Sequence, residues 1–150
     1  MRRRLAHLAA AVLPLLASGA ALAIDYASVA RPAILYDTPS PQGQKLAIIR
    51  TGTPVEIVVA NPDAQWVKVR DPSGALSWIE GDALGTRRTV FVTVEQAMVR
   101  RAASDAAPPA FAARREVVLE FVAIEPGGWI RVRHADGSDG YLRASEAWGF

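Results

Sequence analysis

The chain has 150 residues, of which 51% are hydrophobic, and its formal net charge is +2 at pH 7. This length accommodates one ordinary domain or two very small ones. The absence of cysteine excludes a disulfide framework, a thiol nucleophile and a cysteine metal site, so the fold must be stabilised by apolar cores.

The start of the chain has the layout of a secretory signal peptide. Three arginines at positions 2–4 precede an apolar run over residues 5–16, and the small residues Ala21 and Ala23 follow it. A transmembrane helix needs about 20 apolar residues, and this run is shorter. We therefore expect residues 1–23 to be a signal helix that is cleaved after Ala23. The mature chain would have no stable membrane span and would be periplasmic or secreted; a retained N-terminal anchor is the alternative.

Cleavage changes the charge of the chain, because it removes three arginines and no acidic residue. Of the 17 basic side chains 14 remain, against 15 acidic ones, which gives a formal charge of −1. A protein that binds nucleic acid phosphates carries a basic stripe. The composition therefore predicts no nucleic acid partner.

The pattern of residues 24–85 predicts short strands separated by turns. Residues 55–59 follow a proline and are rich in β-branched side chains, which favours a strand. Residues 66–70 alternate between apolar and basic or aromatic side chains, as in a half-buried strand. Residues 61–63 and 71–74 are rich in Asn, Asp, Pro, Ser and Gly, which are turn residues.

The second half of the chain repeats this pattern, and the repeat determines the expected fold. The run at residues 66–70 returns at residues 129–133, and the same offset of 63 pairs Gly74 with Gly137. Further upstream the offset is 64 and pairs residues 33–35 with residues 97–99, so the second copy is one residue shorter in the loop between.

Each copy has about 60 residues, which suits a five-stranded barrel better than a sandwich of roughly 100. We expect an all-β protein with one barrel over residues 24–85 and a second over residues 86–150. The join near residues 84–86 is short, so the two barrels are expected to touch or to hold a fixed relation.

The repeated motifs resemble the bacterial Src-homology-3-like (SH3b) family, in the tandem form found in exported bacterial proteins. The resemblance covers nearly all of residues 26–150. In the first copy it rests on Ala33-Ile34-Leu35-Tyr36-Asp37, Gly52-Thr53-Pro54-Val55-Glu56-Ile57, Trp66-Val67-Lys68-Val69-Arg70, Gly74 and Trp78-Ile79. In the second copy it rests on Trp129-Ile130-Arg131-Val132-Arg133, Asp136-Gly137 and Gly140-Tyr141-Leu142. It implies SH3-like barrels and a binding role.

Three departures from the family pattern bear on function. The first copy has Ser77 where the pattern prefers the glycine seen at Gly140, and the second copy has Arg100 where the first has Tyr36. The proline that lines the peptide groove of eukaryotic relatives has no counterpart after Trp78 or Tyr141. Proline-rich recognition is therefore not expected.

The mature chain offers little for catalysis. Its one histidine, His134, stands beside a predicted turn, and no G-x-S-x-G motif surrounds a serine. The carboxylates are scattered, without the histidine or cysteine spacing of a metal site. We expect no enzyme activity, no cofactor and no metal.

Aromatic side chains are the better candidates for function, because they combine a large contact area with a polar group. The candidate ligand-binding residues are Tyr36, Trp66, Trp78, Trp129 and Tyr141. The alternative for the tryptophans that begin the repeated strands is that each closes its own core. The C-terminal Trp148 and Phe150 either cap a barrel or form a docking tail.

The sequence therefore predicts a non-catalytic exported binding module that recognises peptidoglycan or cell-envelope peptides. The alternative is an adaptor or regulatory protein that binds another envelope protein through one barrel face.

Overall fold

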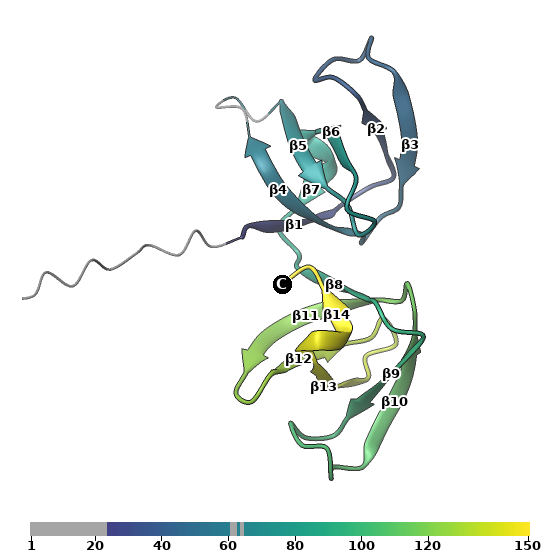
Figure 1. The fold of residues 1–150 in the computed structure, drawn as a ribbon, viewed down its shortest axis with the longest axis vertical. Helices are drawn as coiled ribbons and strands as arrows, with labels where there is room; N and C mark the ends of the chain where they lie inside the picture. Colours follow the sequence, from purple (N-terminus) through teal and green to yellow (C-terminus); the bar gives the residue numbers. More distant parts are fainter. Residues whose placement is uncertain (1–23, 61–62, 64) are drawn as a thin grey trace, which may run out of the picture.

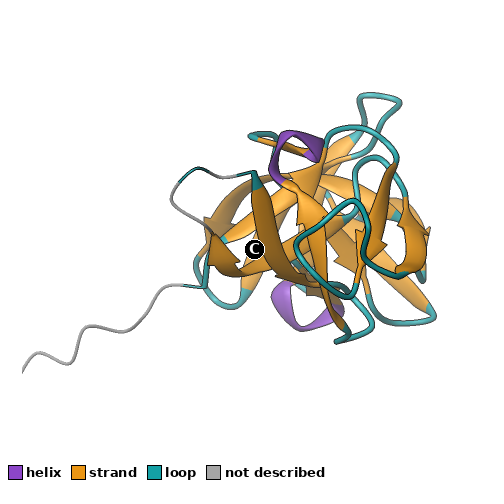
Figure 2. Cartoon of the chain, turned by 90° about the horizontal axis from the view of Figure 1, so that it is seen from above, coloured by secondary structure: helices purple, strands orange, loops and turns teal. Residues whose placement is uncertain are grey.

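The computed structural model describes residues 24–60, 63 and 65–150. The predicted signal helix and its cleavage position after Ala23 lie outside these residues. Strands make up most of the described chain, and the two 3-10 helices are single turns (Figure 2). The all-β expectation is confirmed. No helix within the described residues is long and apolar enough to cross a membrane.

The first seven strands form one antiparallel sheet, which we call unit one (Figure 1). Its strand order is β3-β2-β6-β5-β4-β1-β7. The elements are β1 (Tyr26–Val29), β2 (Ala33–Tyr36), β3 (Lys45–Ile49), β4 (Pro54–Ala60), β5 (Trp66–Arg70), β6 (Leu76–Glu80), the 3-10 helix η1 (Gly81–Ala83) and β7 (Leu84–Gly85).

The remaining strands form a second sheet, unit two, with the same connectivity. Its strand order is β10-β9-β13-β12-β11-β8-β14. The elements are β8 (Thr89–Val92), β9 (Gln96–Arg100), β10 (Pro109–Arg114), β11 (Val118–Glu125), β12 (Trp129–Arg133), β13 (Asp139–Arg143), the 3-10 helix η2 (Ala144–Glu146) and β14 (Ala147–Trp148).

The expected number of five strands per copy is corrected to seven. The first strand of each unit pairs on one side with the longest strand of its sheet, β4 or β11, and on the other with a strand of two residues. The two-residue strands β7 and β14 follow a 3-10 turn. They are too short to show an alternating pattern, so tertiary pairing alone defines them.

Each unit has its own apolar core, built from the inward side chains that alternate with outward ones along its strands. Val55, Val69 and Ile79 are fully buried in unit one, and Val99, Ile130 and Leu142 are fully buried in unit two. These positions follow the period-2 pattern of the sequence. The repeat of sequence is therefore a repeat of topology and of core.

The two units contact each other where β1 meets β8. The Thr89 hydroxyl donates a hydrogen bond to the Gly52 carbonyl at 2.6 Å. The Ser28 hydroxyl lies 2.6 Å from the same Thr89 oxygen and, since that oxygen's proton is already used, acts as the donor. The C-terminus lies between the units (Figure 1). There Trp148 packs edge-to-face on Tyr26, with ring centroids 5.2 Å apart.

Candidate ligand-binding site

The outward face of β5 and β6 in unit one carries polar and aromatic side chains. Val67 and Val69 point into the core, so Trp66 and Lys68 point outward and are half-buried. On the neighbouring strand Trp78 and Glu80 are half-buried in the same way. The strand register places Trp66 opposite Glu80, and Lys68 opposite Trp78.

Tyr36, at the end of β2, joins this face. Its backbone pairs with Trp78, and its ring meets the Trp66 ring edge-to-face, with centroids 5.3 Å apart and planes at 87°. The Lys68 ammonium lies 5.8 Å from the centroid of Trp78. The structure thus brings together the three candidate aromatic residues of unit one. Tyr36 is buried at 6% exposure, whereas Trp66 and Trp78 keep part of their surface open.

Two adjoining hollows run along this aromatic face, and we call them the unit-one groove. The larger hollow, of about 600 Å³, is lined by Pro41, Asp63, Gln65, Trp66, Glu80 and Asp82. The smaller, of about 340 Å³, is lined by Arg31, Pro32, Ala33, Ile34, Tyr36, Ile48 and Glu80. Glu80 lines both hollows, so they adjoin at this residue.

Charged residues at the groove were not among the sequence candidates. The Arg31 guanidinium binds the Glu80 carboxylate at 3.2 Å and the Asp82 carboxylate at 2.6 Å. These two hydrogen-bonded carboxylates raise the pKa of Arg31. Glu80 follows Trp78 by two residues on one strand, so the period-2 pattern already placed it on the aromatic face. Arg31 comes from the turn before β2, and only the tertiary structure brings it there.

Unit two has a different arrangement at the equivalent position. Trp129 is buried at 3% exposure, and the Arg143 guanidinium lies over its ring at 4.1 Å from the centroid. Arg143 also pairs with Asp105 and donates a hydrogen bond to the Gly127 carbonyl at 3.1 Å. The chain therefore covers this tryptophan with its own side chains.

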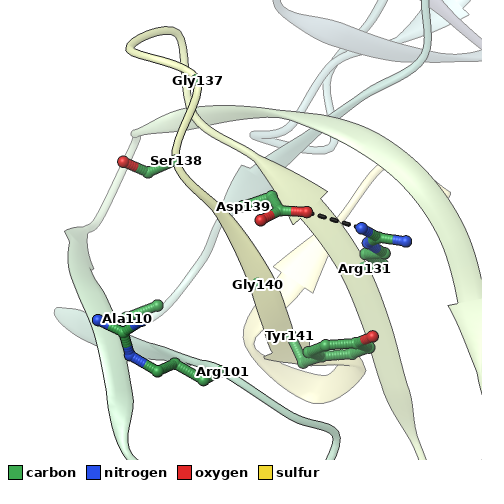
Figure 3. Close-up of a pocket in the computed structure, with 8 residues that line it drawn as sticks. All are labelled: Arg101, Ala110, Arg131, Gly137, Ser138, Asp139, Gly140 and Tyr141. Carbon is green, nitrogen blue, oxygen red and sulfur yellow. Dashed lines mark hydrogen bonds and ion pairs between the residues drawn. The ribbon is translucent and has the colours of Figure 1, made fainter.

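Tyr141 lines a separate hollow of about 410 Å³ in unit two, together with Arg101, Ala110, Arg131, Gly137, Ser138, Asp139 and Gly140 (Figure 3). Arg131 and Asp139 form an ion pair of 2.7 Å in its wall (Figure 3). The hydrogen bond from Arg131 lowers the pKa of Asp139. Arg100 replaces the tyrosine of unit one and donates a hydrogen bond to the Ala107 carbonyl at 2.8 Å. The two candidate aromatics of unit two therefore do not share a groove.

Unit two has three pairs of adjacent arginines, at residues 87–88, 100–101 and 114–115. Arg87 pairs with Glu120 at 2.6 Å, and Arg115 lies 3.6 Å from Glu95. Arg88 lies over the Phe121 ring, 5.2 Å from its centroid. Arg87, Arg88 and Arg115 therefore each make a contact within the chain.

Comparison with known proteins supports the assignment of both units. The sequence model of the bacterial SH3 domain matches residues 29–84 and again residues 93–149. A search of curated proteins found no significant match.

Several solved structures are similar at low identity. NlpC2 from Trichomonas vaginalis is 14% identical over 86% of this chain and 49% of its own, with a TM-score of 0.39. NlpC1 from the same organism is 14% identical over 91% and 50%, with a TM-score of 0.38. An NlpC/P60 family protein from Bacillus cereus is 16% identical over 83% and 56%, with a TM-score of 0.37. The chain thus spans about half the length of these proteins.

Proposed function

The chain belongs to the bacterial SH3 domain family, and from this we propose that it is a non-catalytic binding module of the cell envelope. Its ligand is peptidoglycan or an envelope peptide, and unit one is the principal binding unit. The units are assigned to residues 24–85 and 86–150. One observation carries the proposal: the Tyr36–Trp66 ring pair forms part of an open groove.

Aromatic rings in a groove suit recognition of a peptide or a sugar-linked peptide. They provide a large contact area at low cost in side-chain entropy. The Trp66 ring packs edge-to-face with the Tyr36 ring and lies on β5, so its orientation is set before a ligand arrives. A group that is already ordered loses less entropy on binding.

Export is the second part of the proposal, and it rests on the pattern of residues 1–23. Cleavage after Ala23 would give a mature chain that begins at Ile24. Intact-mass measurement on the protein isolated from its host tests this directly. A mass that includes residues 1–23 would contradict cleavage.

Co-sedimentation with purified peptidoglycan sacculi tests binding. We expect the chain to sediment with sacculi and Trp66→Ala to weaken this binding by about tenfold or more, since truncating an aromatic hot spot costs about 2 kcal/mol. Tyr141→Ala removes a half-buried outward aromatic of unit two and is the matched control, with binding expected to stay near that of the parent chain.

Circular dichroism and thermal melting of each variant separate lost binding from lost folding. If the folded parent chain stays in the supernatant, the peptidoglycan proposal is wrong. If Trp66→Ala and Tyr141→Ala weaken binding equally, unit one is not the principal binding unit.

An adaptor that binds another envelope protein is the second candidate. One observation favours it: the edge strand β3 exposes Leu46 and Ile48, at 49% and 76%. An unpaired edge strand is a template for pairing with another chain.

A further inference from the structure

The unit-one groove has an acidic rim beside its aromatic wall. Asp63, Glu80 and Asp82 line the hollow at Trp66, and the guanidinium of Arg31 pairs with two of these three carboxylates. Three carboxylates against one guanidinium leave the groove with two net negative charges. Asp82 is 77% exposed at its side chain, so its charge is accessible to a ligand.

In unit two, an arginine side chain of the chain itself occupies the equivalent position. The registers match: Trp66 lies opposite Glu80 in unit one, and Trp129 lies opposite Arg143 in unit two. The Arg143 guanidinium covers the Trp129 ring at 4.1 Å and pairs with the carboxylate of Asp105. In unit two, therefore, a cation of the chain itself lies on the indole face and is held there by a carboxylate.

Two charged residues of the groove, Arg31 and Glu80, have residues of opposite charge at the equivalent positions of unit two. Tyr36 of unit one corresponds to Arg100, and Arg31 corresponds to Glu95, both at the repeat offset of 64. Glu80 corresponds to Arg143 at the offset of 63. Unit one therefore has the tryptophan and the carboxylates, but the internal cation that covers the tryptophan in unit two is replaced by a carboxylate.

We propose that the unit-one groove binds the ammonium group of a peptide ligand, seated on Trp66 against the Glu80 and Asp82 carboxylates. The ligand takes the place that Arg143 takes in unit two. This rests on the proposed envelope-peptide function and names the chemical group that is recognised.

General physical chemistry favours an ammonium group at this position. An ammonium group over an indole face is attracted by the negative face of the ring, and a carboxylate in contact adds to this attraction. The smaller hollow, lined by Pro32, Ile34 and Ile48, offers apolar contact to the adjoining part of the peptide. A ligand with only carboxylates is repelled by the rim.

Isothermal titration calorimetry with a matched pair of peptides tests this on the full chain. Both are peptidoglycan stem peptides with lysine at the third position and a blocked N-terminus. One has a free lysine amine, and the other has this amine acetylated. We expect the free-amine peptide to bind about tenfold more tightly, and the difference to shrink as salt is raised.

Charge variants test the same contact from the protein side. Asp82→Asn should weaken binding of the free-amine peptide by about threefold and leave the acetylated peptide unchanged. Arg31→Ala removes the only cation of the groove lining within the described residues and should strengthen binding of the free-amine peptide. Glu95→Gln, at the equivalent of Arg31 in unit two, is the control and should change neither affinity.

The outcomes separate this inference from the proposed function. Equal affinities for the two peptides, or sacculus binding without binding of the free-amine peptide, would overturn the inference alone. Absence of binding to both peptides and to sacculi would overturn the inference and the proposed function together.

Discussion

Ser77 and Gly140 occupy equivalent positions on β6 and β13 but have different surroundings. A Cβ atom on Gly140 would lie 2.6 Å from the Arg100 carbonyl oxygen and 2.7 Å from Val99 Cγ1. Unit one has a serine at this position, and that side chain is buried at 4% exposure. Its hydroxyl has no hydrogen-bond partner among the described residues. The two units therefore differ in how closely β13 and β6 approach their neighbouring strands.

This difference predicts opposite responses to alanine. Gly140→Ala should lower the free energy of unfolding by about 1–3 kcal/mol, because the Arg100 carbonyl belongs to the backbone and cannot move freely. Ser77→Ala should leave it unchanged or raise it slightly, because it removes a buried hydroxyl without a partner. Urea unfolding of both variants checks this. A stable Gly140→Ala protein would show that β9 shifts easily.

The edge strand β3 has apolar side chains that are exposed to solvent. Every residue of this strand except Ile49 is exposed, although the strand pairs with β2 along its length. Strands at the edge of a sheet are usually protected by charge, proline or a bulge. Here Lys45 begins the strand, and a bulge interrupts its pairing with β2 beside Tyr36. These features limit open-ended pairing but leave the apolar side chains of the strand accessible.

Leu46→Lys separates the two candidate functions at this strand. Leu46 is exposed and does not line the unit-one groove, so the substitution should leave stability and sacculus binding near those of the parent chain. If the adaptor function holds, a partner recovered from envelope extracts by the parent chain should be lost with Leu46→Lys. Recovery of the same partner by both proteins would exclude β3 as the adaptor surface.

At the scale of the whole molecule, the C-terminal segment packs against both units. Trp148 meets Tyr26 of unit one, and Phe150 stacks on Phe121 of unit two with centroids 6.0 Å apart. At this contact, burial is the main cause that raises the pKa of the Tyr26 hydroxyl.

Gly149, between these two aromatic residues, has φ of +111°, and a Cβ atom there would lie 2.6 Å from Pro54 Cβ. Glycine is needed at this close approach between the units. The segment is therefore an internal cap and not a free docking tail.

Gly149→Val should loosen the contact between the units, because valine fits neither the backbone angle nor the space against Pro54. We expect calorimetric unfolding of the parent chain to show one transition and that of Gly149→Val to show two, or one of lower enthalpy and temperature. Gly74→Val is a suitable control, because Gly74 shares the positive φ but a Cβ atom there would meet no other atom within 4 Å. Identical melting of Gly149→Val and the parent would contradict the role of this contact.

Much of the fold could be predicted from the sequence because its signals are local. The alternation at residues 66–70 and its return at residues 129–133 predicted two matching all-β units, and the matched family confirms them. The number of strands could not be predicted, since β7 and β14 have two residues each and exist only through pairing with β1 and β8. Period-2 patterns need at least several residues to be visible.

The sequence by itself determined the repeat, the inward faces of the strands and the aromatic residues available for recognition. Only the tertiary structure decided which aromatic residues remain open. Trp66 and Trp129 begin matching motifs, but one lies opposite Glu80 and the other lies beneath Arg143. The physical reason is that alternation sets the face on which a side chain lies, whereas its coverage depends on the side chain that the neighbouring strand places across from it.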